Sequence, residues 1–411
     1  LQEEKVTLAP NRQLFRVDRH GFLPDMMQKM YDDRSVYKKK AIEAKKQLET
    51  TKDEDERYEI EKRIARYNNL QLAKKVSLNS AYGAMGNQYF RFFDIRIAEA
   101  ITLAGQLSIR WIELRINKYM NNLLKTENVD YVVASDTDSI YLTLDEIVRR
   151  AFADNLERTD SSRIISFMDK ICENKIQPFI DESYQSLATY VNAYAQKMQM
   201  KREALADRGI WTAKKRYIMN VHNNEGVQYA KPKLKVMGLE MIKSSTPSAI
   251  REKMKDVIEL ILQGTENDVQ EFIDNFRSEF SKLPPEEISF PRGVNGLNEY
   301  SDVASIYKKG TPIHVKGALI YNSLLENKQL TKKYQKIQEG EKLRFTYLKL
   351  PNIINETVIS YPGRLPQEFD LHRFVDYDMQ FEKAFIEPIK IILDCVGWKA
   401  EATSDLTSFF S

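Results

Sequence analysis

The sequence has few cysteines and no long apolar segment. Its two cysteines, Cys172 and Cys395, are too few for a disulfide framework or a cysteine zinc site, and this scarcity is typical of a reducing compartment such as the cytoplasm. No run of about 18 apolar residues occurs, and the first residues carry no apolar signal region. Secretion, a membrane span and a membrane partner are therefore not expected.

The chain also lacks an excess of charge of either sign. Its 62 Lys and Arg residues nearly balance 59 Asp and Glu residues, which leaves a formal net charge of +3. A nucleic-acid-binding protein with so small an excess must concentrate its basic groups locally. The composition, with 42% hydrophobic and 29% charged residues, is that of a globular protein. A length of 411 residues predicts roughly two or three domains.

The first part of the chain is predicted to be mainly helical. Short extended segments are expected at 5–8 and 13–17, separated by turn residues. Good helix formers dominate 25–50 and 56–80, with a highly charged turn between them, which predicts a helical hairpin. Apolar residues spaced three and four apart predict an amphipathic helix at 97–124.

The middle of the chain is predicted to be helices on an antiparallel sheet, and the end to be helical with loops. The predicted strands are 131–135, 139–144, 209–221 and 227–239. The predicted helices are 162–199, 250–262, 269–280 and 380–392. A proline-containing, loop-rich region separates the last two helices, and a domain boundary is predicted near Glu240.

Two carboxylates lie at the turn between the first two of these strands. Asp136 and Asp138 flank Thr137 at a tight bend, where both can converge on a divalent cation, which prefers hard oxygen ligands. Asp and Ser also favour ordinary Asx turns. An apolar strand followed by Asp-x-Asp opens phosphatases of the haloacid dehalogenase type as well, although there the motif runs into a loop and helix instead of a returning strand.

A second group of polar side chains lies on the predicted helical hairpin. Lys75 and Asn79 are four residues apart and share one helical face, and Arg34 and Lys38 repeat this spacing in the preceding helix. Guanidinium forks and ammonium point charges are good donors to phosphate oxygens. Each pair alone is more typical of a solvated surface, whereas all four converging between the helices would form a triphosphate clamp.

These motifs resemble those of family B DNA polymerases, most closely the replicative polymerases of tailed bacteriophages that use sliding clamps. Lys75-x3-Asn79-Ser80-x-Tyr82-Gly83 is similar to the fingers motif of the family, and Asp136-Thr137-Asp138-Ser139 to its metal-binding palm motif. The resemblance covers essentially the whole chain. Further similar segments begin at Gly21, Lys214, Lys243, His314 and Glu339.

The resemblance implies an α+β right-hand fold with an antiparallel palm sheet, helical-hairpin fingers and a mixed, largely helical thumb. It assigns 1–23 and 81–239 to the palm, 24–80 to the fingers, 240–399 to the thumb and 400–411 to a C-terminal tail. The implied activity is transfer of deoxynucleotides from their triphosphates to the primer 3′ end of primer-template DNA. The chain would then act in the cytoplasm of a bacterial host.

Roles for individual residues follow from the same resemblance. Asp138, with Asp136 in a supporting role, would ligate two Mg²⁺ ions, and Glu203 resembles a carboxylate near the metals. Lys75 would also assist the leaving pyrophosphate, while Tyr82 and Gly83 would lie against the nascent base pair. The residues implied to hold the triphosphate are Arg34, Lys38, Lys75 and Asn79. The implied DNA contacts are Arg91, Arg96, Lys214, Lys215, Arg216, Tyr217 and Lys316.

One departure from the family concerns the chemistry directly. The palm motif Asp-x-x-Ser-Leu-Tyr-Pro-Ser, which supplies another metal-binding aspartate, is absent from the sequence, as are the exonuclease carboxylates. Asp136 and Asp138 alone would leave two cations under-neutralised. We therefore expect the C-terminal part of a polymerase, naturally split or cut to a fragment. A separate N-terminal polypeptide with the exonuclease would complete it, across an exposed edge near residues 1–20.

The C-terminal tail suggests a further partner. Leu406, Phe409 and Phe410 have the apolar, double-aromatic pattern with which polymerases dock onto a sliding clamp, although a helix end packed on the thumb would explain them too.

Two other functions stay open for the whole chain. One is a non-catalytic DNA-binding accessory subunit with the polymerase fold, and the other is a haloacid-dehalogenase-like phosphatase built on Asp136 and Asp138.

Overall fold

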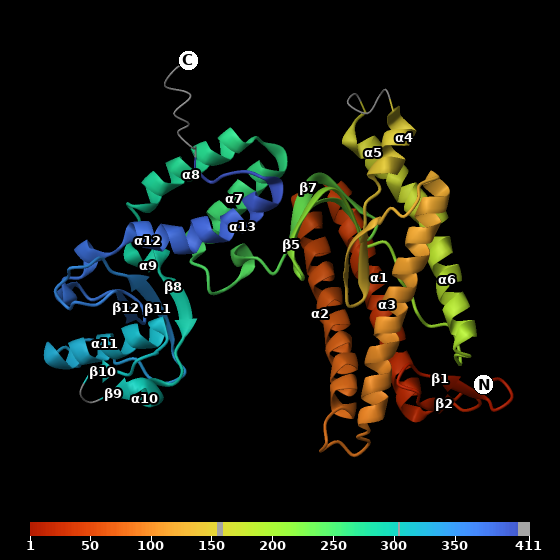
Figure 1. Ribbon diagram of the computed structural model, residues 1–411, viewed down its shortest axis with the longest axis horizontal. Helices are drawn as coiled ribbons and strands as arrows, with labels where there is room; N and C mark the ends of the chain where they lie inside the picture. The colour runs from red at the N-terminus through yellow and green to blue at the C-terminus, as the bar shows by residue number, and fades with distance from the viewer. Residues whose placement is uncertain (154–158, 303–304, 402–411) are drawn as a thin grey trace. The chain divides into compact units, whose positions relative to one another are not determined.

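The computed structural model describes residues 1–153, 159–302 and 305–401, which form two compact units (Figure 1). The first unit comprises Leu1–Asp207 and Asn220–Leu234, and the second comprises Arg208–Met219 and the residues from Lys235 onward. Helices and small antiparallel sheets make the fold class α+β, as predicted. Within the described ranges, no helix is long and apolar enough to cross a membrane.

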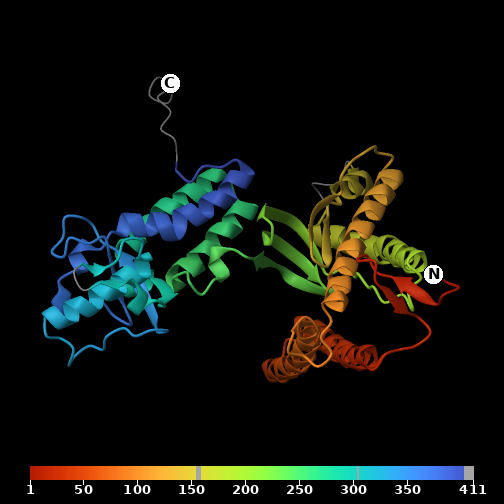
Figure 2. The ribbon, with the colours of Figure 1, turned by 60° about the horizontal axis from the view of Figure 1, so that its bottom comes forward.

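The helical hairpin of the first unit is formed by α1 (Phe22–Thr50) and α2 (Glu54–Met85), which lie side by side in both views (Figures 1 and 2). Asp53 caps α2, because its carboxylate accepts the backbone N–H of Glu56 at 2.8 Å. The predicted hairpin is confirmed, and both helices extend beyond their predicted bounds.

The chain before this hairpin forms two short strands. β1 (Val6–Leu8) and β2 (Leu14–Arg16) pair antiparallel, close to their predicted positions. Thr7 Oγ1 donates to the carbonyl of Val191 at 2.7 Å, which ties β1 to the segment after α6 (Gln177–Tyr190). Three apolar side chains near this sheet are exposed, as expected for this region: Leu1, Leu8 and Leu14.

The core of the first unit lies on one face of α3 (Ile95–Leu124). Ile112, Ile116 and Met120 are completely buried along this face. The helix itself was predicted from apolar spacing between Ile97 and Leu114, but the expectation that this whole stripe is core is wrong, because Ile101 and Leu114 are exposed. The three buried residues belong to one cluster with the strands and helices that follow. These elements are β3 (Val132–Asp136), β4 (Ser139–Leu142), α4 (Asp145–Phe152), α5 (Ser161–Ile171), the π-helical turn η2 (Cys172–Ile176) and α6 (Gln177–Tyr190).

Replacing Ile116 by alanine is expected to lower the free energy of unfolding of the first unit by about 2–5 kcal/mol, because it opens a cavity in this core. Leu114→Ala is the matched control, since Leu114 lies on the same helix with 73% of its surface exposed. Urea unfolding of both variants measures the difference. An equal loss in the two would contradict the assignment of the buried face.

A three-stranded sheet follows in the order β5 (Ala204–Ala213), β6 (Arg216–Asn224) and β7 (Val227–Met237). The prediction of one strand over 209–221 is wrong, because the chain turns at Lys214 and Lys215. Lys215 has a positive φ of 63°, and neither lysine is a typical turn residue. Gly238 makes this turn possible, since a Cβ at its position would lie 2.3 Å from the carbonyl oxygen of Lys215.

The predicted helix at 162–199 is also too long. It is interrupted by η2 and ends at Tyr190, and the chain then continues without regular structure to β5. The backbone N–H of Asn192 bonds to Thr189, and Asn192 adopts a left-handed φ of 52°. A helix cannot continue through this conformation.

The second unit combines a helical layer with a small sheet. Four aromatic rings, Phe276, Phe280, Phe381 and Phe385, stack edge to face or tilted in its core. The region predicted to be loop-rich contains a sheet and a helix that covers it. The sheet order is β12 (Val358–Tyr361), β11 (Lys342–Tyr347), β8 (Phe290–Gly293), and the helix is α11 (Ile313–Asn327).

The other elements of the second unit are mostly helical. A 3₁₀ turn, η3 (Glu240–Ile242), leads into α7 (Ser248–Gln263) and α8 (Glu266–Phe280), near their predicted bounds. The predicted last helix begins earlier, as α12 (Tyr377–Phe381), and runs through the π-helical turn η6 (Glu382–Ile386) into α13 (Glu387–Val396). The short elements are α9 (Pro285–Ile288), α10 (Leu297–Tyr300), β9 (Ser301–Asp302), β10 (Ile306–Tyr307), η4 (Gln367–Phe369) and η5 (His372–Phe374).

Candidate active site

The predicted carboxylate hairpin is confirmed as a structure. β3 and β4 pair antiparallel with Asp136 opposite Ser139, so that Thr137 and Asp138 form the connecting turn. Asp136 is half-buried and Asp138 is exposed. Thr137 Oγ1 donates to Asp136 Oδ1 at 3.0 Å. The two carboxylates therefore lie at the exposed end of a hairpin, and β4 returns as a strand, unlike the arrangement of a haloacid dehalogenase motif.

The hairpin is fixed to α3 at its start. Asn117 on α3 accepts the backbone N–H of Tyr131 at 2.8 Å and donates to Asp130 at 2.7 Å. Tyr131 and Val132 are buried in the core beside α3. The acidic turn is thus held by a rigid base, which is what precise placement of metal ligands requires.

The carboxylates offer the right kind of donor for a hard cation but too few of them. Carboxylate oxygens suit Mg²⁺, which takes about six oxygen ligands. Across the residues that the structure describes, no group of three or more His, Cys, Asp or Glu side chains is placed to hold a metal. Asp136 and Asp138 can therefore supply part of a cation site, and the remaining ligands must come from substrate, water or other protein groups.

The four predicted phosphate-binding residues lie on the facing helices of the hairpin. Lys74 on α2 bonds to Asp33 on α1 at 2.7 Å, which brings the neighbouring residues Arg34 and Lys75 to the same level of the two helices. This bond holds the pKa of the Asp33 carboxyl below its ordinary value. Lys75 and Asn79 are exposed, so both can reach a ligand from solvent.

Arg34 and Lys38 differ in their surroundings. Arg34 is half-buried, and its Nε has no hydrogen-bond partner within the described part of the chain. An unsatisfied, buried guanidinium nitrogen is unfavourable unless a ligand completes its bonding. Lys38 instead forms an ion pair with Glu225, in the turn between β6 and β7. Sequence reasoning missed Glu225, because the partner is 187 positions away in the chain.

The end of α2 carries the residues predicted to contact the nascent base pair. Tyr82 is 39% exposed. A Cβ added to Gly83 would meet no atom within 4 Å, so packing within the chain does not require glycine there. Both positions are therefore open to a ligand, and their role at the nascent base pair stays a prediction.

The predicted DNA contacts of the first unit lie beyond α2, next to exposed aromatic side chains. Arg91 lies 5.6 Å from the ring centroid of Phe92. Arg96 bonds to Asp94 through two nitrogens, at 3.0 and 2.7 Å. This pair raises the pKa of Arg96 and lowers that of Asp94, mainly through the side-chain hydrogen bond. The exposed aromatic residues nearby in the chain are Tyr89, Phe92 and Phe93.

The other predicted DNA contacts belong to the second unit. Lys214 and Lys215 form the turn between β5 and β6, and Arg216 pairs with Glu240 at 2.8 Å. Tyr217 is buried, with its ring centroid 6.2 Å from that of Trp211. Lys316 pairs with Glu356 at 2.8 Å. Their contacts with DNA stay predictions, and the carboxylate partners of Arg216 and Lys316 also give these two residues a structural role.

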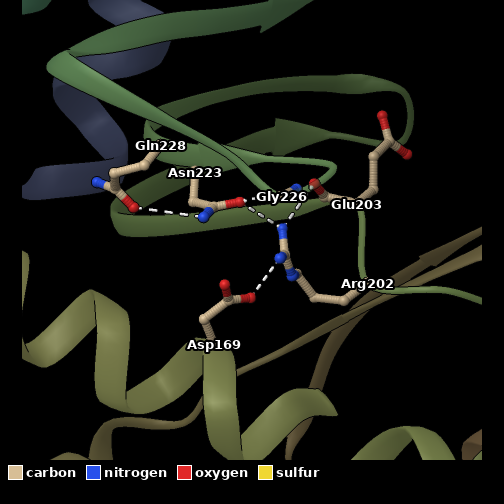
Figure 3. Close-up of polar contacts among 6 residues, drawn as sticks. All are labelled: Asp169, Arg202, Glu203, Asn223, Gly226 and Gln228. Carbon is tan, nitrogen blue, oxygen red and sulfur yellow. Dashed lines mark hydrogen bonds and ion pairs between the residues drawn. The ribbon is translucent and has the colours of Figure 1, made fainter. Parts of the chain in front are cut away.

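Glu203 lies next to a polar network that the sequence did not reveal. The guanidinium of Arg202 bonds to Asp169 on α5 and donates to Asn223 Oδ1 on β6 at 2.6 Å. Figure 3 shows the side chain of Glu203 pointing away from this network. Its backbone carbonyl accepts the N–H of Glu225 at 2.6 Å. The role of Glu203 near the metals stays a prediction.

Two family models match parts of the chain. The sequence profile "DNA polymerase family B" matches residues 1–161, and the profile "Divergent Family B DNA polymerase" matches residues 122–274. The two matches together cover residues 1–274, and they confirm for this part of the chain the resemblance to family B DNA polymerases found in its motifs. Leu406, Phe409 and Phe410, predicted to bind a clamp, lie outside the described residues.

The curated relatives include phage polymerases. The chain is 30% identical to the DNA-directed DNA polymerase of Enterobacteria phage T4 over 99% of its own length and 50% of the phage protein. It is 32% identical to that of Escherichia phage RB69, over 98% of this chain and 49% of the relative. A DNA polymerase of Pyrococcus glycovorans is 23% identical over 94% of the chain. The chain thus spans about half the length of the phage relatives.

Proposed function

We propose that this chain is the C-terminal catalytic portion of a DNA-directed DNA polymerase that extends a primer on a DNA template. One observation carries the proposal. A single compact unit contains both the carboxylate hairpin and the cationic helical hairpin, and both lie within the segment similar to DNA polymerase family B. Similarity to phage DNA-directed DNA polymerases supports a role in DNA replication. The chain would act in the cytoplasm of a bacterial host.

The helical hairpin would bind the deoxynucleoside triphosphate. Arg34 offers fork donors, Lys38 and Lys75 offer point charges, and Asn79 offers an amide to the phosphate oxygens. Lys75 would stabilise the charge that develops on the leaving pyrophosphate.

Asp138 and Asp136 would hold Mg²⁺ at the end of the β3–β4 hairpin. When bound, two Mg²⁺ ions supply charge neutralisation at the triphosphate and make the primer hydroxyl more acidic. The two aspartates cannot complete both coordination shells. We propose that the missing aspartate motif is supplied by polymerase sequence outside this chain, which also carries the exonuclease. Glu203 would add a carboxylate near the same site.

The remaining predicted residues would position DNA. Tyr82 and Gly83 would lie against the nascent base pair, where a flat ring tests shape without reading sequence. The exposed aromatic and basic residues after α2 suit a nucleic-acid strand, since bases stack on aromatic rings and phosphates attract cations. Arg91 and Arg96 would lie near the template, and Lys215 near the primer terminus. The other DNA contacts would be Lys214, Arg216, Tyr217 and Lys316.

Nucleotide-dependent binding of primer-template DNA tests this proposal. Addition of the complementary deoxynucleoside triphosphate should tighten binding of the duplex to the polymerase completed with the missing motif. An accessory subunit would bind DNA without responding to nucleotide, and a phosphatase would not bind the duplex. Nucleotide-independent binding would therefore overturn the proposal.

We also propose that the C-terminal tail binds a sliding clamp. Replacing Leu406, Phe409 and Phe410 by alanine should abolish clamp-dependent processivity, because these side chains would fill an apolar pocket on the partner. Distributive synthesis without the clamp should be unchanged. Thr407→Ala with Ser408→Ala serves as the matched control, and the product length per binding event is the measurement. Unchanged processivity in the triple variant would refute this role.

A further inference from the structure

The ion pair between Lys38 and Glu225 joins a proposed phosphate-binding residue to a carboxylate of the same unit. A carboxylate and a phosphate both accept hydrogen bonds from an ammonium group and compete for its charge. The Lys38 side chain is 45% exposed and that of Glu225 is 23% exposed. A triphosphate arriving from solvent can therefore reach the ammonium, but Lys38 must leave Glu225 to bind it fully.

Glu225 has a backbone conformation that is unusual for glutamate. Glu225 and Gly226 connect β6 to β7 with φ angles of 52° and 81°. Two successive positive φ angles define a type I′ turn, whose first position favours Asn, Asp or Gly. Glutamate is unfavourable there. The side chain of Glu225 forms its ion pair with Lys38 from this turn.

The same turn is held in place by the network around Arg202 (Figure 3). Asn223 Oδ1 accepts both from Arg202 at 2.6 Å and from the backbone N–H of Gly226 at 3.0 Å. The N–H of Glu225 donates to the carbonyl of Glu203 at 2.6 Å. The backbone N–H groups of both turn residues are therefore hydrogen-bonded. These bonds fix the backbone of Glu225, which limits the positions at which its carboxylate can meet Lys38.

A second ion pair joins α1 to the same β-hairpin farther along. Lys233 on β7 bonds to Glu49 on α1 at 3.0 Å, with side-chain exposures of 58% and 22%. Glu49 lies three helical turns beyond Lys38, outside the proposed phosphate-binding group. This pair resembles the Lys38–Glu225 pair in its chemistry, in its partial exposure and in joining α1 to the β6–β7 hairpin, but it lies away from the proposed triphosphate site.

We propose that Glu225 is a latch that occupies Lys38 in the nucleotide-free chain and is displaced by the triphosphate. Glu225 is thereby a positioning residue that sets nucleotide affinity, and this inference rests on the proposed function of the helical hairpin. Only molecules in which Lys38 has left Glu225 can bind the triphosphate with all four proposed residues. The apparent affinity is therefore the intrinsic affinity multiplied by the fraction of molecules in that state. Removing the latch should tighten binding.

The experiment titrates the chain, completed with the missing polymerase motif, with magnesium dTTP opposite a template adenine. Glu225→Gln should tighten dTTP binding by roughly two- to five-fold, the range expected for a partly exposed ion pair. Glu225→Asn should do the same, and asparagine also suits the backbone of the turn. The gain should shrink at high salt, because salt screens the pair. Glu49→Gln is the control and should leave the affinity unchanged.

A double variant separates the latch from a general effect on the fold. In a Lys38→Ala background, Glu225→Gln should have no further effect on dTTP affinity. Equal or weaker dTTP binding by both Glu225 variants, with Lys75→Ala still weakening it, would overturn the latch and leave the proposed function intact. If neither Lys38→Ala nor Lys75→Ala changed dTTP affinity, the proposed triphosphate site and the latch would both be wrong.

Discussion

Changing Asp138 to asparagine is expected to lower primer extension by the completed polymerase at least about a hundred-fold, the scale of losing one preorganised electrostatic group. Asparagine keeps the shape of the side chain but removes the charge that would hold the cation. Because Asp138 is exposed at the end of a hairpin that is fixed to α3, the substitution should leave the fold intact. Rapid-quench measurement of single-nucleotide incorporation gives the rate.

Asp136→Asn should have a smaller effect than Asp138→Asn, because Asp136 is assigned a supporting role. Asp145→Asn is a suitable control, since Asp145 is an exposed carboxylate in the first turn of α4, seven positions beyond Asp138. Its extension rate should match that of the unmodified protein. If Asp138→Asn extended primers at the normal rate, the metal assignment would be wrong.

Changing Lys75 to alanine should weaken deoxynucleotide binding by about 1.5–3 kcal/mol, the range for a hydrogen bond to a charged group. Arg34→Ala should give a loss of the same order. Duplex affinity should remain nearly unchanged, because the proposed partner of both residues is the triphosphate. Nucleotide titration of the polymerase–DNA complex measures the effect.

Lys62→Ala provides the comparison for Lys75→Ala. Lys62 is an exposed lysine on the same helix, paired with Glu59 at 2.8 Å and close to the tip of the hairpin. Its loss should not change nucleotide affinity. Equal losses from Lys62 and Lys75 would show a general charge effect, and no loss from Lys75 would remove it from the triphosphate site.

The sequence predicted elements whose signals are local and repeated. The helical hairpin and α3 follow from helix formers and from apolar spacing over many turns. The β3–β4 hairpin follows from two β-rich runs around an acidic bend. The helical hairpin and the β3–β4 hairpin carry most of the proposed site. The sequence could therefore predict which of its residues lie on helices and which lie at a turn between strands.

Other elements depended on contacts between distant parts of the chain. α11 lacks a single apolar stripe, because it is buried around much of its circumference and Gly317 lies against the sheet, where a Cβ would meet Ser360 Oγ at 2.4 Å. The turn at Lys214 and Lys215 carries no Gly, Pro or Asn. Its conformation depends on Gly238, more than twenty positions later.

The candidate site also combines features predicted from local sequence with contacts between distant parts of the chain. Helical spacing paired Arg34 with Lys38 and Lys75 with Asn79, and the family resemblance joined the two pairs into one predicted triphosphate site. Spacing could not predict that Lys38 pairs with Glu225, because that pair depends on how the β6–β7 turn meets α1. Polar partners far apart in sequence become visible only once the fold brings them together.

Primer extension by the chain alone and by the completed polymerase tests the central claim most directly. We predict no detectable extension by the isolated chain with Mg²⁺, because Asp136 and Asp138 cannot hold two cations without a further carboxylate. Adding polymerase sequence that carries the missing aspartate motif should restore extension. Robust extension by the isolated chain, or none by the completed polymerase, would contradict this account.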